Sequence, residues 1–67
     1  MNGNFVVYCE LKDGQIGFIC DYNLDKKTYH TVLDPFFAKV FDVKIIGDID
    51  KMLNWIGVRH YFFQFNP

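Results

Sequence analysis

Residues 4–22 read NFVVYCELKDGQIGFICDY and alternate between apolar and polar side chains on both sides of an Asp13-Gly14 pair. Side chains two positions apart on a strand share a face, so each half of this stretch has one apolar and one wetter face. An Asp-Gly pair favours a two-residue turn that needs positive φ at both positions. We therefore predict an antiparallel hairpin in which Lys12 pairs with Gln15 and one face is buried.

This register assigns every hairpin side chain to a face. The predicted core face carries Phe5, Val7, Cys9, Leu11, Ile16, Phe18, Cys20 and Tyr22. The opposite, wetter face carries Val6, Tyr8 and Ile19. Large apolar side chains on a wet face are typical of surfaces that bind another molecule.

The same register places both cysteines among core residues. Cys9 then lies opposite Phe18, which leaves the Cys9 and Cys20 sulfurs too far apart for a disulfide. A turn on Gly14-Gln15 would keep the faces but place Cys9 opposite Cys20, and the sequence leaves this alternative open. Two thiols in so short a chain are typical of a reducing compartment, where we expect them to stay free.

The middle of the chain is partly ambiguous. Residues 28–33 are rich in β-branched and aromatic types and predict a third strand. In residues 35–46, Asp34 and Pro35 favour the start of a short helix that runs to Phe41. The alternation of residues 39–46 instead favours a strand that ends at Gly47. The sequence does not decide between helix and strand here, although the strand fits better.

The last third of the chain predicts a helix and a strand. Residues 48–57 have an apolar stripe at helical spacing, with Asp48 as N-cap and Gly57 past the end. Residues 58–65 alternate and have aromatics on both faces, which is typical of a central strand with neighbours on both sides. An exposed edge there would be prone to aggregate, so we expect this chain or a second copy to cover it.

Together these elements predict an α+β fold in a single domain, residues 1–67. The predicted sheet is small and mainly antiparallel, with three to five strands, an N-terminal β-hairpin and one short helix packed on a face. A small open β-barrel is the alternative.

Charge and hydropathy narrow the function classes. The chain has seven basic and eight acidic residues, whereas nucleic-acid binders usually carry a basic excess. No stretch is long and apolar enough to span a bilayer, and the first residues do not resemble a signal peptide. We therefore expect a cytoplasmic protein, in the host cytoplasm if it is viral, with no membrane partner.

The candidate catalytic groups do not form a known pattern. There is no serine, which excludes Ser-His-Asp chemistry. Cys9 and Cys20 occupy apolar positions, where desolvation disfavours a reactive thiolate. Cys9, Cys20, His30 and His60 do not have the ligand spacing of zinc fingers. We predict no catalytic residue, no cofactor, no metal and no enzymatic activity.

Aromatic content points towards protein binding. Thirteen of the 67 residues are aromatic: eight Phe, four Tyr and one Trp. We predict an interface from the apolar residues that the pattern leaves outside the core, namely Val6, Tyr8, Ile19, Trp55 and Phe62. The predicted function is a small non-enzymatic protein-binding module, in one form a phage or viral inhibitor that sterically blocks a host enzyme or defence complex. A homodimer through the C-terminal strand is compatible with it.

One alternative function rests on a short resemblance. Gly17-Phe18-Ile19, followed by Tyr29-His30, is similar to the aromatic strands of cold-shock proteins and other OB-like single-strand binders. The resemblance covers a few residues and lacks the family's first aromatic motif, so we assign no family. It implies single-stranded nucleic-acid binding through sheet aromatics.

Overall fold

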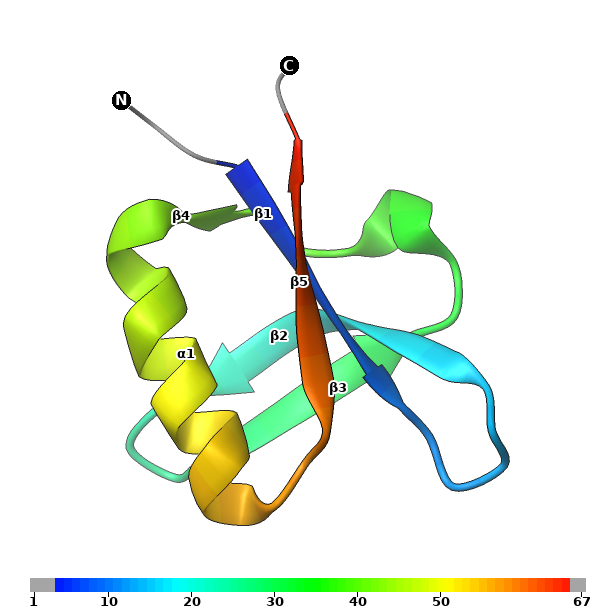
Figure 1. The fold of residues 1–67 in the computed structure, drawn as a ribbon, viewed down its shortest axis with the longest axis horizontal. Coiled ribbons are helices and arrows are strands. Elements are labelled where there is room, and N and C mark those ends of the chain that lie inside the picture. Colours follow the sequence, from blue (N-terminus) through cyan, green and yellow to red (C-terminus); the bar gives the residue numbers. More distant parts are fainter. Residues whose placement is uncertain (1–3, 66–67) are drawn as a thin grey trace.

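The computed structural model describes residues 4–65, which form a five-stranded antiparallel sheet with one α-helix (Figure 1). In chain order the elements are β1 (Asn4–Glu10), β2 (Ile16–Asn23), β3 (Thr28–Val32), the 3₁₀ turn η1 (Pro35–Phe37), β4 (Phe41–Asp42), α1 (Val43–Ile56) and β5 (His60–Phe65). This confirms the α+β class, the N-terminal hairpin and the third strand.

The first strand, β1, is the centre of the sheet. Along one edge it pairs with β5, from Asn4 opposite Phe65 to Cys9 opposite His60. The other edge is shared, because β2 pairs with the end of β1 and β4 pairs with its beginning. β3 lies outside β2. The strand order is therefore β3-β2-β1-β5. The short β4 lies on the same side of β1 as β2 and pairs with the first residues of β1, which β2 does not reach.

The β1–β2 turn contains three residues, Lys12-Asp13-Gly14, rather than two. The Leu11 amide donates to the Gln15 carbonyl (2.8 Å), and the Gly14 amide donates to the Leu11 carbonyl (3.0 Å). Gly14 has φ +85°, the left-handed conformation that three-residue hairpin loops need at their last position. The predicted turn on Asp13-Gly14 is therefore wrong, as is the alternative on Gly14-Gln15.

A one-residue difference in register exchanges the two faces of a strand. The structure pairs Tyr8 with Phe18 and Cys9 with Gly17, so Ile19 points into the core and is fully buried. Ile16 and Phe18 belong to the opposite face. The predicted faces are correct for β1 and wrong for the first half of β2.

Glycine at position 17 lets β2 pack closely against its neighbours. A Cβ atom there would lie 3.0 Å from both a Leu11 methyl carbon and the Thr31 Cβ. Contacts this short are tighter than most real Cβ contacts, so a side chain at position 17 would require Leu11 and Thr31 to move by a few tenths of an ångström. Leu11 and Thr31 therefore occupy the space that a side chain at position 17 would need.

A β-bulge at Cys20 restores the predicted face in the second half of β2. Ile19 pairs with Thr31 and Asp21 pairs with His30, so Cys20 is the extra residue. After the bulge Tyr22 packs against the core, with its ring centroid 5.5 Å from that of Phe41. Cys20 is only half-buried, which corrects its predicted place in the core.

The helix begins earlier than predicted. Asp42 is the N-cap, and its carboxylate accepts a hydrogen bond from the Lys44 amide (3.0 Å). Both alternatives for residues 35–46 are present in part: the helix capped by Asp34 is the 3₁₀ turn η1, and the strand is limited to β4. The predicted cap at Asp48 is wrong. Gly47 is exposed inside the helix and does not interrupt it. Burial outweighs the weak helix propensity of the β-branched residues in the first turns.

The end of α1 agrees with the prediction. Gly57 has φ +91°, and its amide donates to the carbonyls of Leu53 (3.0 Å) and Asn54 (3.1 Å). Glycine is the residue that adopts this helix-ending conformation at least cost. A contact between Asp50 and His60 then ties the helix to the start of β5 (Oδ1 to Nε2, 2.7 Å).

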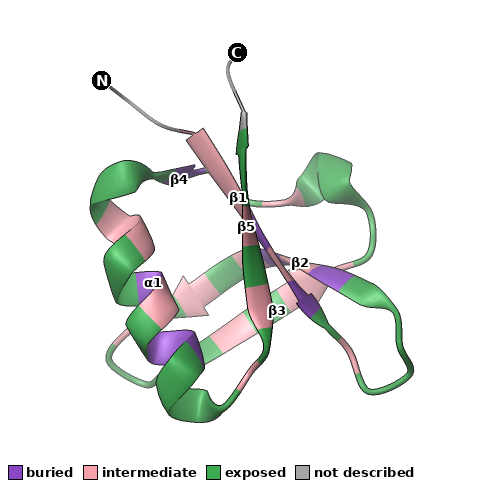
Figure 2. Ribbon diagram, viewed as in Figure 1, coloured by how far each residue is buried: buried purple, intermediate pink, exposed green. Residues whose placement is uncertain are grey.

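The core lies between α1 and the inner face of the sheet (Figure 2). Its buried members come from β1, β2, β4 and α1: Val7, Ile19, Phe41, Ile49, Met52 and Leu53. Burying one such aliphatic or aromatic side chain stabilises the fold by about 1.5–3 kcal/mol. Because α1 covers only one face of the sheet, the apolar residues of the other face remain at the surface.

Candidate functional site

The outer face of the sheet, the one turned away from α1, carries a row of aromatic rings across three strands. Tyr8 lies on β1, directly opposite Phe18 on β2 and Tyr61 on β5. Its ring stacks on Tyr61 with centroids 5.3 Å apart and tilts against Phe18 at 6.0 Å. Tyr61 is 40 % exposed. We call this face, with the row at its centre, the outer aromatic face.

An apolar pair flanks the row on one side, where Val6 lies opposite Phe63. On the other side Ile16 follows Phe18 and lies opposite Glu10, so a charged residue borders the face there. Phe63 and Ile16 are 59 % and 48 % exposed. Aromatic pairs are rigid and present apolar area at low entropic cost on binding. The outer aromatic face is thus preorganised for contact with another surface.

The five predicted interface residues divide into three groups. Val6 and Tyr8 both lie on the outer aromatic face and are half-buried. Ile19 is buried in the core because of the register change. Phe62 packs against the core beside the His60 ring, since the inner face of β5 carries the even-numbered residues. Trp55 is exposed on α1 and is not part of the outer aromatic face.

Basic residues are absent from the described strands. Each of the six lysines, and Arg59, lies in a turn, in the helix or in a connection. A sheet that binds single-stranded nucleic acid combines stacking aromatics with cations that follow the phosphates. The strands of the outer aromatic face supply the aromatics without a lysine or arginine.

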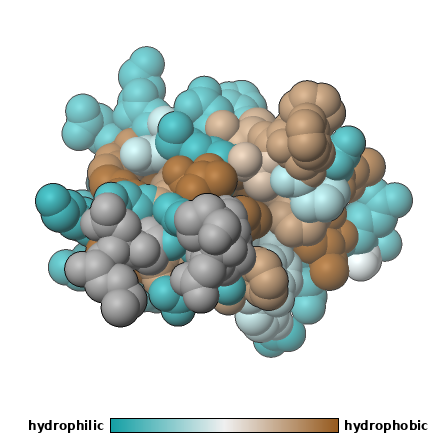
Figure 3. All heavy atoms as spheres, turned by 90° about the horizontal axis from the view of Figure 1, so that it is seen from above, coloured by the Kyte–Doolittle hydropathy of each residue, from teal (hydrophilic) through white to brown (hydrophobic). Residues whose placement is uncertain are grey.

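A second exposed apolar feature surrounds η1, and the sequence patterns did not predict it. We call it the η1 tip. Its four large apolar side chains are Leu33 (58 % exposed), Phe36 (85 %), Phe37 (65 %) and Val40 (52 %). Figure 3 shows apolar side chains gathered on the side of the molecule where η1 lies. Positions 33, 36, 37 and 40 follow the i, i+3, i+4, i+7 spacing of an amphipathic helix. That pattern predicts a buried helical stripe, whereas the structure places these side chains at the surface around a short turn.

Local hydrogen bonds hold the η1 tip in shape. The Asp34 carboxylate accepts from the Phe36 amide (2.9 Å), and the Asp34 carbonyl accepts from the Phe37 amide (3.1 Å). Pro35 fixes its own φ at the first position of the turn. The Lys39 amide donates to the Ile19 carbonyl (2.9 Å), which fastens the segment to β2. The Phe36 and Phe37 rings meet edge to face at 5.5 Å.

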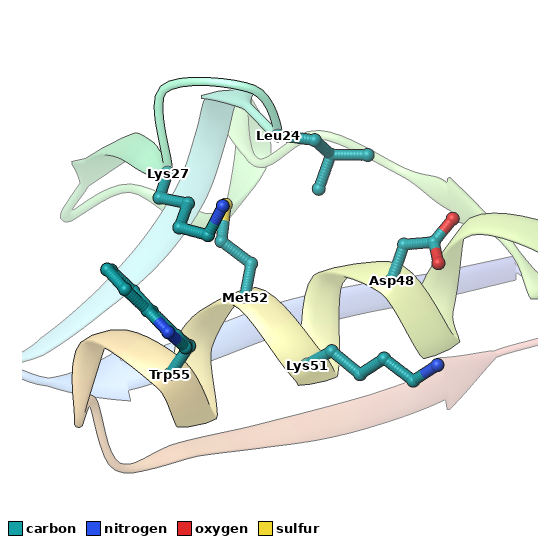
Figure 4. Close-up of a pocket in the computed structure, with 6 residues that line it drawn as sticks. All are labelled: Leu24, Lys27, Asp48, Lys51, Met52 and Trp55. Carbon is teal, nitrogen blue, oxygen red and sulfur yellow. The ribbon is translucent and has the colours of Figure 1, made fainter.

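The third feature is a groove of about 290 Å³ between the β2–β3 turn and α1 (Figure 4). We call it the Trp55 groove. Leu24, Met52 and Trp55 form its apolar part, and Lys27, Lys51 and Asp48 form its rim. Trp55 is 73 % exposed, and the Lys27 ammonium lies 5.2 Å from the centroid of its ring. Asp48 lies towards the other end of the groove (Figure 4).

The thiols and histidines lie in separate structural settings. Burial raises the pKa of the Cys9 thiol, whose sulfur lies 3.7 Å from the Gly17 carbonyl oxygen. The Cys20 sulfur lies 3.6 Å from the His30 carbonyl oxygen. Both cysteines are free. Among the described residues, no three His, Cys, Asp or Glu side chains are grouped as metal ligands.

Both ring nitrogens of His60 already have partners. Nδ1 lies 2.8 Å from the Val58 carbonyl oxygen, and Nε2 lies 2.7 Å from Asp50 Oδ1. A carbonyl only accepts hydrogen bonds, so Nδ1 must donate. The ring is therefore used to join the helix to β5.

No protein-family model, curated protein or solved structure matches this chain. No helix in the part of the chain that the structure describes is long and apolar enough to cross a membrane.

Proposed function

We propose that this protein is a non-enzymatic protein-binding module whose binding surface is the outer aromatic face. The observation that carries this proposal is the row of Phe18, Tyr8 and Tyr61 rings across three strands. Tyrosine in a fixed, partly exposed position is typical of the residues that dominate protein interfaces. The rigid sheet keeps these rings in place before binding.

The charge distribution supports a protein partner over a nucleic acid. The row has no lysine or arginine beside it on the strands, and the net charge is −1. Protein interfaces have an apolar centre with few charges, whereas nucleic-acid affinity depends on neutralised phosphates. Oligonucleotide binding that quenches tyrosine fluorescence and weakens steeply with salt would instead support the nucleic-acid alternative.

A steric inhibitor encoded by a mobile element is one specific form of this function. Blocking a host enzyme or defence complex needs only a rigid surface that covers a site on the target, and in this form of the proposal the outer aromatic face is that surface. This form predicts that excess purified protein lowers the activity of the bound target in a simple titration.

The test compares two variants that each add one negative charge. Tyr61→Glu places a carboxylate in the aromatic row, and Val43→Glu places one at an equally accessible apolar site on α1; Val43 is 48 % exposed. Tagged wild-type protein and both variants are used to capture partners from lysate of the source cell. The captured protein is then purified and its dissociation constants are measured.

We expect Tyr61→Glu to weaken binding at least tenfold and Val43→Glu to leave it unchanged. Circular dichroism checks that both variants keep the fold. Equal affinities for the two variants would contradict the assignment of the outer aromatic face, and the absence of any specific partner would count against the function itself.

Among the described residues, β5 pairs with β1 alone and is an edge strand, so the predicted central position is wrong within one chain. His60–Phe65 contains none of the charges or prolines that usually protect such an edge. We propose that this edge can pair with a second copy. Such pairing would use β5 alone and would not involve η1 or the second half of α1.

A further inference from the structure

The η1 tip and the Trp55 groove lie at opposite ends of the molecule. In Figure 1, η1 is at the upper right, and the β2–β3 turn and the second half of α1, which form the groove, are at the lower left. One feature is a protruding apolar turn and the other is an apolar hollow. We propose that the η1 tip of one copy inserts into the Trp55 groove of a second copy, so that the chain associates head to tail.

Size supports this contact. An apolar cavity of about 150 Å³ is enough to hold a benzene molecule, and the groove has about 290 Å³. One phenyl ring of the tip fits the hollow, with room beside it for part of the second ring. Phe36, at 85 % exposed, extends furthest into solvent and is the inserted residue. The fixed turn at Asp34-Pro35 means that little entropy is lost on insertion.

Charge supports a second copy as the occupant. The tip carries an acidic residue before its rings, Asp34, and a basic residue after them, Lys39. The groove carries Lys27 beside Trp55, and Asp48 together with Lys51 towards its other end (Figure 4). Asp34 of the tip therefore meets an opposite charge if it approaches Lys27, and Lys39 does so if it approaches Asp48 rather than Lys51.

The charged groups at the groove have no ion pair of their own within the described part of the chain, although the Lys27 ammonium lies over the Trp55 ring. Among the described side chains, the one ion pair within 4 Å joins His60 to Asp50, so Lys27, Lys51 and Asp48 have no such partner. Partly desolvated pairs of this kind add specificity and orientation more than affinity. The apolar ring insertion supplies the attraction, and the charges set its direction.

The symmetry of the contact determines the product. A tip that binds a groove elsewhere on the molecule forms a heterologous contact, which leaves one tip and one groove unused at the ends. Because the two features lie at opposite ends, a pair of copies cannot satisfy both contacts at once. The expected product is an open chain of copies that lengthens with concentration, rather than a closed dimer.

Sedimentation equilibrium between about 10 µM and 1 mM measures this directly. We expect the average mass of the wild type to rise beyond that of a dimer. Phe36→Asp removes the tip, and Trp55→Glu removes the groove wall and adds a charge that repels Asp34. Each variant alone is expected to remain a monomer, while the control Val43→Asp associates like the wild type.

Mixing the two variants gives the decisive measurement. Phe36→Asp keeps an intact groove and Trp55→Glu keeps an intact tip, so an equimolar mixture should form a 1:1 complex and stop there. Trp55 is the only tryptophan, so in the mixture all tryptophan emission comes from the groove that receives the tip. We expect that emission to move to shorter wavelength on mixing.

Two results would overturn the proposal. The first is a wild type that remains monomeric at 1 mM, which would leave the tip and groove to other partners. The second is a wild type that associates while the mixed variants stay monomeric, which would indicate a symmetric contact such as β5 edge pairing. Phe37→Asp serves as a second tip variant if Phe36→Asp fails to fold. Tyr61→Glu should leave this association intact, which separates it from the proposed function.

Discussion

Truncation of Ile19 tests the observed register of the hairpin. Ile19 is fully buried against Val7, Phe41, Ile49 and Leu53. Replacing a buried isoleucine by alanine costs about 2–5 kcal/mol, from lost transfer energy and the cavity left behind. At about 0.05–0.15 kcal/mol per residue, a 67-residue domain has a total stability of about 3–10 kcal/mol. Ile19→Ala is therefore expected to remove about half of the stability or more.

Ile16→Ala is the matched control, because it makes the same change three residues earlier on the same strand. Ile16 is 48 % exposed, so its truncation should cost less than about 1 kcal/mol. Urea unfolding followed by far-UV circular dichroism gives both free energies, and the slope with urea should stay the same. The two-residue turn would instead bury Ile16 and expose Ile19. A larger loss for Ile16→Ala than for Ile19→Ala would therefore refute the three-residue loop.

Substitutions at two glycines and at Asp50, together with a rise in pH, test the helix and the core. Gly47→Ala should stabilise the protein by up to about 1 kcal/mol, because Gly47 lies in the helix interior with open space around its Cα, whereas Gly57→Ala should destabilise it because φ is +91°. Asp50→Ala should cost about 1–3 kcal/mol by leaving a His60 nitrogen without a partner, while Asp50→Asn should cost less because an amide can pair with either form of the ring. Burial raises the pKa of Cys9 above its ordinary value of 9.0, so the folded state keeps the thiol proton longer than the unfolded state. Stability should therefore be fully present below pH 9 and fall as the pH rises through the folded-state pKa.

Each of these expectations has a clear contrary result, measured by thermal or urea unfolding. Equal effects of alanine at the two glycines would contradict the helix boundaries. Asparagine and alanine at position 50 with the same cost would show that the Asp50–His60 contact contributes no hydrogen-bond energy. A Cys9→Ala variant with the same alkaline loss as the wild type would show that the loss arises elsewhere, with Tyr29 as the next candidate because burial and the nearby Cys9 raise its pKa.

The hairpin shows how far the sequence could predict the fold. Alternation around Asp13-Gly14 located the two strands and the region of the turn between them, because both features are local. Loop length was not predictable, since a glycine at position 14 suits both a two-residue turn and the last position of a three-residue loop. The difference of one residue in loop length determines which face of β2 is buried. The bulge at Cys20 then reversed the faces again, and nothing local in the sequence marks it.

The start of the helix was ambiguous for a different reason. Residues 43–46 include three β-branched side chains, and their alternation fits a strand. The same residues also begin an apolar stripe that continues through Ile49, Met52 and Leu53, which only packing against the sheet selects. Asp42 and Asp48 are both reasonable caps by residue type.

The candidate site was predicted only in part. Val6 and Tyr8 follow from the alternation of β1, which the register error did not affect. Phe62 was misplaced because both faces of β5 are aromatic, so composition cannot distinguish the inner face from the outer one. The η1 tip depends on a turn that exposes two phenylalanines, and apolar residues in a connecting segment are normally expected to pack inside.

The central position of β1 has a consequence for biosynthesis. Of the described strands, β1 is translated first, and its long edge pairs with β5, the one translated last. The nascent chain therefore cannot complete this sheet until β5 has been translated, and its apolar hairpin has to stay soluble in the meantime. Contacts between such distant parts of a chain also slow folding. Truncated products that lack the final strand should accordingly depend on chaperones or be degraded.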